Sequence, residues 1–122
     1  MKKMDGAGLA KMQTLDDALI HLQRIHGVVE RIAMAVRSQQ DTAQLRQQLN
    51  RTATPLVGLL KPQFGMISDL VTALILVLSR GGGDQSRLRS LREFVAQIRT
   101  ALEIAVAKTK ELHMTDSSSS AE

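Results

Sequence analysis

The side chains that could act in acid–base or metal chemistry are few. The chain has three histidines, His21, His26 and His113, and no cysteine, which excludes a thiolate metal site and a cysteine nucleophile. His26 and Glu30 are four residues apart, so on a helix they share one face and could reach one metal ion. Metal sites in four-helix bundles instead draw several inward carboxylates from different helices, and the inward positions here carry no acid. We therefore predict no metal and no cofactor.

The acidic residues do not form a catalytic pair. Asp16 and Asp17 are adjacent, and neighbours on a helix point about 100° apart, so their carboxylates diverge. Asp69 is the one acid inside an apolar stretch; if buried, its pKa would rise and it could act as a base. We interpret Asp69 instead as part of a narrow wetted stripe with Thr72. No arrangement of serine, histidine and acid indicates a nucleophilic site, so we expect no catalytic residue and no enzyme.

Arginines gather between residues 80 and 99. Arg92 and Arg99 are seven residues apart and share a helix face beside an apolar stripe. Such a flank can bind carboxylates, and we predict Arg87, Arg92 and Arg99 as contacts to an acidic protein partner. The alternative partner is a polyanion such as nucleic acid, although the stacking aromatics typical of nucleic-acid binders are missing. A third interpretation is that these arginines pair with acids elsewhere in the chain.

Hydrophobic periodicity predicts the elements that carry these residues. Apolar side chains recur at spacings of three and four, which is typical of helices packed on two neighbours. Thr14 is expected to cap the first helix, and Pro55 to kink the second, with Thr54 and Pro55 as a possible restart. The sequence leaves open whether 55–79 is one bent helix or two. The predicted fold is an all-α, antiparallel up-down four-helix bundle with helices at 14–39, 41–61, 63–80 and 84–113.

Length and composition indicate one domain. The chain has 122 residues, 43% of them hydrophobic, and a formal net charge of +4. We predict a flexible N-terminus at 1–12, the bundle at 13–113 and a disordered Ser-rich tail at 114–122. No signal peptide is expected because Asp5 interrupts the apolar run such a peptide needs. The stretch at 64–79 falls short of the ~20 residues of a spanning helix, so a cytoplasmic protein without a transmembrane segment is expected.

The stretch at 64–79 is more apolar than a monomeric bundle requires. Its apolar side chains cover most of a helix circumference, whereas one apolar face is enough to join a core. We therefore expect a second copy of the chain to cover the surplus, because two-fold homodimers are the commonest soluble oligomers. The predicted self-association residues are Leu70, Leu74, Leu76 and Val77.

These observations favour a non-enzymatic protein–protein interaction module. We expect a small cytosolic adaptor or regulatory subunit of bacterial type that acts as a homodimeric helical bundle. Polyanion binding through the arginines between residues 80 and 99 is the alternative. A metal-binding bundle is a third and weaker one.

Overall fold

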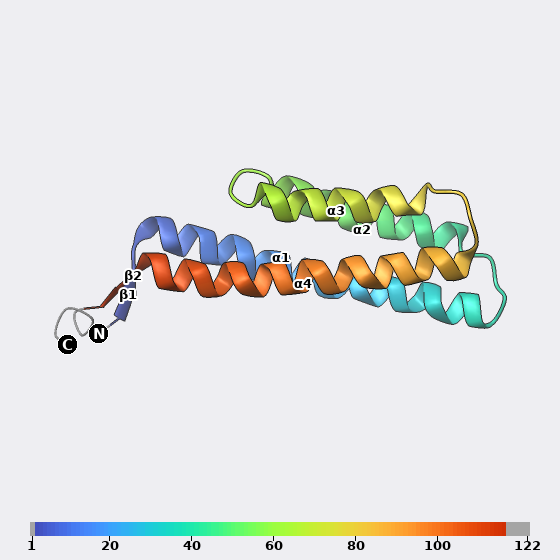
Figure 1. Ribbon diagram of the computed structural model, residues 1–122, viewed down its shortest axis with the longest axis horizontal. Coiled ribbons are helices and arrows are strands. Elements are labelled where there is room, and N and C mark those ends of the chain that lie inside the picture. The colour runs from blue at the N-terminus through green and yellow to red at the C-terminus, as the bar shows by residue number, and fades with distance from the viewer. Residues whose placement is uncertain (1, 117–122) are drawn as a thin grey trace.

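The computed structural model describes residues 2–116 and contains four helices. The helices are α1 (Gly6–Arg37), α2 (Ala43–Leu60), α3 (Gly65–Leu78) and α4 (Asp84–His113). In Figure 1 the chain runs away from the termini along α1, back along α2, out again along α3 and back along α4. Helices α1 and α3 each pack against both α2 and α4. The prediction of an all-helical fold with four helices is confirmed.

The first helix begins at Gly6, not at residue 14. Asp5 caps it, because its backbone is extended and its Oδ1 accepts a hydrogen bond from the Gly8 amide at 2.7 Å. Thr14 lies inside the helix, and its hydroxyl donates to the carbonyl of Ala10 at 3.2 Å. Two glycines in the first turn disfavour a helix on propensity alone, and Asp5 compensates by satisfying an amide at the helix start.

Helix α2 passes through Pro55 without a new start. Thr54 does not cap a restart; its hydroxyl donates to the carbonyl of Asn50 at 2.7 Å, as in a helix interior. The predicted kink at Pro55 stays a prediction. The break falls later, at 61–64, so 55–79 belongs to two helices rather than one bent one.

A short antiparallel ribbon joins the two ends of the described chain. Strand β1 (Lys2–Met4) pairs with β2 (Met114–Asp116), with Met4 opposite Met114. The Asp5 amide continues the pairing by donating to the His113 carbonyl at 3.1 Å. Residues 6–12, which were predicted to be flexible, belong to helix α1, and residues 114–116, which were predicted to be disordered, form strand β2. The rest of the predicted tail, 117–122, lies outside the described residues.

One hydrophobic core runs between the four helices. Ser68 of α3 reaches across to α2, where its hydroxyl donates to the carbonyl of Val57 at 3.0 Å. That bond satisfies a buried hydroxyl, whose burial without a partner would be costly. The described residues contain no helix that is both long and apolar enough to span a membrane. The largest fully buried side chains are Leu15, Leu22, Ile25, Leu49, Leu56, Leu60, Leu74, Leu91, Ile98 and Leu102.

The helices differ greatly in length, and the difference creates a step at one end. Helix α4 has 30 residues and α3 has 14, which at 1.5 Å per residue gives lengths of about 45 Å and about 21 Å. Because the connection at 79–83 is short, the end of α3 lies near the start of α4. Most of the extra length of α4 therefore lies at its C-terminal end, beyond the start of α3. Helix α1 likewise outreaches α2. In Figure 1 the α2–α3 turn stops short of the end where both termini lie.

Candidate functional site

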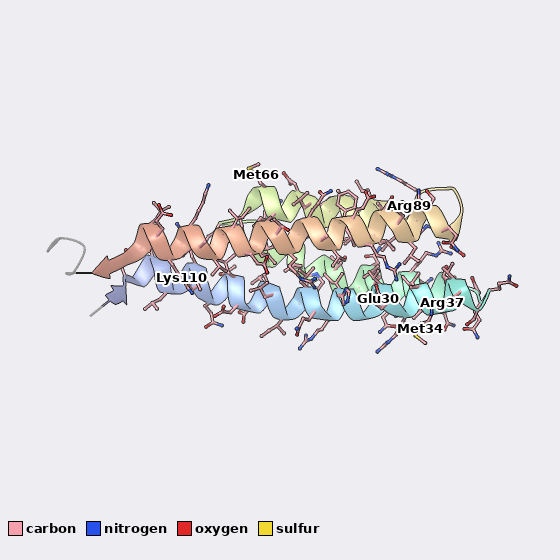
Figure 2. All side chains as sticks on the ribbon, turned by 60° about the horizontal axis from the view of Figure 1, so that its bottom comes forward. Glu30, Met34, Arg37, Met66, Arg89 and Lys110 are labelled. Carbon is pink, nitrogen blue, oxygen red and sulfur yellow. The ribbon has the colours of Figure 1, made fainter. Side chains whose placement is uncertain are left out.

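The step leaves an apolar hollow of about 470 Å³, which we call the shelf. Its floor is the last three turns of α4, its rim is the start of α3, and one residue comes from α1. Three large apolar side chains on it are exposed to solvent: Met66 by 85%, Ile104 by 51% and Leu112 by 74%. In Figure 2 Met66 projects away from the bundle. The shelf is lined by Lys11, residues 63–67, Ala101, Ile104, Ala105, Lys108, Thr109, Leu112 and His113.

The shelf follows from the sequence of α4. Its apolar spacing continues through Leu102, Ala105, Thr109 and Leu112, past the point where α3 begins. Where α3 covers this stripe, Leu102 is fully buried. Beyond that point α3 no longer covers the stripe: Thr109 is still buried by the rest of the chain, but Leu112 is exposed. The apolar pattern of a core-facing helix therefore extends onto a surface that the described chain leaves open.

Charged groups at the shelf come from two chain ends that are far apart in sequence. The Lys11 ammonium lies 3.1 Å from His113 Nε2, and His113 Nδ1 lies 3.3 Å from Asp5 Oδ1. With a neutral imidazole, Nδ1–H donates to Asp5 and Nε2 accepts from Lys11. The Gly8 amide and then His113 hold the pKa of Asp5 below its ordinary 3.8. This network ties the start of α1 to the end of α4 beside the shelf.

Acidification should loosen this end of the bundle. The pKa of Asp5 is lowered in the folded protein, so its contribution to stability is present above pH 3.8 and is lost as the pH falls through the lower folded-state value. We expect the Gly8 amide, followed by NMR, to titrate with a midpoint below 3.8. The Asp5→Asn variant should lose this titration, while Asp69→Asn should keep it. A midpoint at or above 3.8 would contradict the assignment of Asp5 as the cap.

Two of the three predicted partner-contact arginines are already engaged within the chain. Arg92 binds Glu30 of α1 through two bonds, Nη2 to Oε1 at 2.9 Å and Nε to Oε2 at 3.2 Å, and this contact lowers the pKa of Glu30. Arg87 Nη1 lies 2.7 Å from Asp84 Oδ1, and its Nη2 donates to the Arg80 carbonyl at 3.0 Å. The pairing of arginines with the chain's own acids is thus correct for these two residues.

Arg87 should matter for stability rather than for binding. Its side chain is only 11% exposed, and among the described residues its Nε is a buried nitrogen without a hydrogen-bond partner. We expect Arg87→Ala to lower the free energy of unfolding by about 1–3 kcal/mol, because it removes a largely buried side chain and its bonds to Asp84 and the Arg80 carbonyl, although Asp84 keeps the bond from the Thr42 hydroxyl. The exposed neighbour Arg89 is the matched control, and Arg89→Ala should stay within about 0.5 kcal/mol. Equal effects in urea titrations would contradict the structural role.

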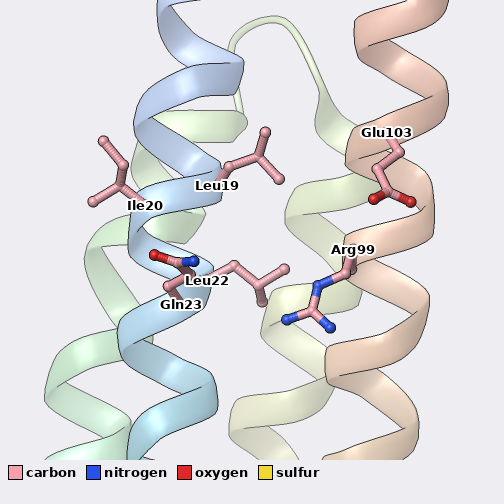
Figure 3. A pocket seen from close by; sticks show the side chains of 6 residues that line it. All are labelled: Leu19, Ile20, Leu22, Gln23, Arg99 and Glu103. Carbon is pink, nitrogen blue, oxygen red and sulfur yellow. The ribbon is translucent and has the colours of Figure 1, made fainter.

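Arg99 is the predicted contact residue that remains available. It is exposed and has no ion-pair partner among residues 5–113. It lies in a hollow of about 390 Å³ between α1 and α4. Figure 3 shows its guanidinium turned toward the seam, with Leu22 and Gln23 opposite and Glu103 one turn further along α4. The predicted arginine surface is therefore reduced to isolated exposed residues rather than a continuous flank.

The four predicted self-association residues are divided between core and surface. Leu74 and Val77 are buried inside their own chain, with exposed fractions of 0% and 2%. Leu70 is half-buried, and Leu76 is 56% exposed. Two of the four thus cannot reach a second copy without unfolding. The apolar surplus of α3 is smaller than predicted because α2 and α4 enclose most of its circumference, which leaves mainly Met66 and Leu76 outside.

The other residues considered for metal binding or catalysis do not lie together in one site. His26 is exposed and borders a hollow with Glu30 and Arg92, but Glu30 is already bound by Arg92. Asp69 is exposed, as expected for a wetted stripe. Within the described part of the chain, no three side chains of the His, Asp or Glu type gather in a way that could hold a metal ion.

No protein-family model, curated protein or solved structure matches this chain. The shelf therefore has to be interpreted from its own residues. Sequence reasoning did not find it, although one signal was present: the apolar spacing of α4 runs on to Leu112, much further than the 14 residues of α3 can cover.

Proposed function

We propose that the protein is a non-enzymatic interaction module, a small adaptor or regulatory subunit built as an antiparallel up-down four-helix bundle. Its shelf receives a helical segment of another polypeptide. One observation carries the proposal: Met66, Ile104 and Leu112 are exposed around a single hollow. Burying a large apolar side chain stabilises a complex by about 1.5–3 kcal/mol, so three of them supply the apolar centre that interfaces require.

Helix-in-groove docking is the recognition mode that this surface supports best. The floor of the shelf is the end of α4 and its rim is the start of α3. A helix placed on the shelf would therefore extend the bundle along α4. Such grooves bind through apolar anchors spaced three and four residues apart on one face of the ligand helix. The charged residues at the edge then fix orientation more than they add affinity.

The alternative of polyanion binding has lost part of its support. It relied on the arginines between residues 80 and 99, of which Arg87 and Arg92 already contact carboxylates. Binding that involves several phosphates needs several unpaired cations on one face. Arg89 and Arg99 are exposed, but they lie about 15 Å apart along α4 and about 80° apart around it, and Arg92 between them is paired with Glu30.

Homodimerisation stays a prediction, and on α3 it now depends on Leu70 and Leu76. A second copy is one possible occupant of the shelf as well. The cross-linking experiment below separates these possibilities by the mass of the adduct. An adduct with twice the mass of the chain identifies a second copy, and any other discrete mass identifies a different protein.

Site-specific photo-cross-linking tests the proposed function. A benzophenone amino acid is placed at position 104, on the shelf, or at position 100, which is exposed on α4 but does not line it. After irradiation in cells that produce the protein naturally, position 104 should give a discrete adduct and position 100 should not. No adduct from position 104, or the same adducts from both positions, would contradict docking on the shelf.

A further inference from the structure

We infer that the occupant of the shelf is an amphipathic helix with acidic residues beside its apolar stripe. This inference rests on the proposed function and specifies the partner's chemistry. Lys11, Lys108 and His113 line the shelf together with its apolar residues, and no aspartate or glutamate of residues 5–113 lines it. The two lysines make this edge cationic, and their pairing with carboxylates on the ligand is what selects an acidic helix.

Both ammonium groups have free hydrogen-bonding capacity. The Lys11 ammonium contacts one side-chain atom, His113 Nε2, which leaves further N–H donors because an ammonium carries three. Lys108 is exposed, and no carboxylate of residues 5–113 is paired with it. The carboxylate of Asp5 is directed at the other ring nitrogen of His113. A carboxylate arriving on a ligand can therefore contact either lysine without displacing an internal ion pair.

The geometry favours a helix over an extended peptide. The shelf continues the groove in which α3 lies on α4, and α4 exceeds α3 by about 24 Å in length at 1.5 Å per residue. A helix of about 16 residues spans that distance. An extended strand pairs its backbone groups best with the edge of a sheet, whereas the floor of the shelf is α4, whose backbone groups are bonded along the helix, and only the first turn of α3 has amides without intrahelical partners.

The chain's own copy is a poorer electrostatic match. In a two-fold pairing of shelf against shelf, the lysines of one copy would face the same cationic surface on the other. Like charges placed together across an interface oppose association. A helix that brings acids to the edge removes this conflict, which is why we assign the shelf to a different, acidic partner.

Two designed peptides test this assignment. Each has about 16 residues, with leucine at heptad positions a and d. One carries glutamate at e and g, and the other carries lysine there, so that copies of either peptide repel each other. Fluorescence anisotropy with the full-length protein should show at least tenfold tighter binding of the glutamate peptide. Lys108→Glu should remove most of this preference for the glutamate peptide. Lys110→Glu, which makes the same charge change outside the shelf, should preserve it.

The outcomes separate this inference from the proposed function. If both peptides bind equally and Ile104→Glu abolishes both, the shelf docks helices but does not select acids, and the inference is wrong while the function stands. Binding of neither peptide, or equal loss of preference in Lys108→Glu and Lys110→Glu, also overturns the inference. Peptide binding that competes with a protein dimer, seen by light scattering, would assign the shelf to a second copy and overturn it as well. Selective binding without a cross-link at position 104 would instead contradict the function.

Discussion

Leu74→Glu should unfold the protein, whereas Leu76→Glu, two residues further along α3, should leave it folded. Leu74 is fully buried, so glutamate would place an unpaired carboxylate in the core and remove a packed side chain. We expect a loss of at least about 4 kcal/mol in the free energy of unfolding, which is a large part of the stability of a small domain. Urea titration followed by circular dichroism measures both variants.

Leu76→Glu is the matched control because its side chain already meets solvent. Its free energy of unfolding should change by no more than about 0.5 kcal/mol. The same variant tests the predicted homodimer: if α3 mediates self-association, light scattering should give a dimer for the wild type and a smaller mass for Leu76→Glu. A folded Leu74→Glu variant would contradict the burial of α3 within its own chain.

Leu102→Ala and Ile104→Ala form a second pair with a large expected difference. Leu102 is enclosed by the bundle and Ile104 is half exposed on the shelf. Truncation of Leu102 should cost about 2–5 kcal/mol in the free energy of unfolding, because it removes apolar contacts and leaves a cavity. Truncation of Ile104 should cost less than about 1 kcal/mol, since the side chain has few contacts to lose. Thermal melts and urea titrations measure both.

The contrast between these two residues separates stability from binding. A residue that is apolar, exposed and dispensable for folding contributes mainly to contacts outside the chain. If Ile104→Ala destabilised the protein as much as Leu102→Ala, the region around Ile104 would be part of the core. The shelf would then not be an open surface, and both proposals would lose their basis.

Much of the fold was predictable because apolar periodicity records which faces are buried. The four helices agree with the spacing, and α4 begins and ends at the predicted residues, Asp84 and His113. The predicted start of α1 was wrong because helix propensity penalises Gly6 and Gly8. The cap by Asp5 was a local signal, three residues from Gly8, that this reasoning missed, whereas the packing against α4 involves residues far along the chain. The possible restart at Pro55 was wrong, since loss of one backbone hydrogen bond does not end a helix that the core holds on one face, while the kink there stays a prediction.

The candidate site was less predictable because it depends on relative helix lengths. Periodicity shows that Leu74, Leu76 and Val77 lie on a helix, but which face its neighbours cover depends on the packing of α2 and α4. The partners of Arg87 and Arg92 were equally hidden, since Glu30 lies 62 residues from Arg92 along the chain. The network of Asp5, Lys11 and His113 arises only when both chain ends meet.

The central claim is that the shelf is open in the isolated chain and covered by a partner where the protein works. The chain has no cysteine, so Ile104→Cys and Thr100→Cys each introduce a single thiol whose alkylation rate reports exposure. In the purified protein both thiols should react at similar rates. In cells that produce the protein naturally, the thiol at position 104 should be protected at least tenfold while that at position 100 reacts as before. Equal reactivity of the two thiols in cells would contradict the claim.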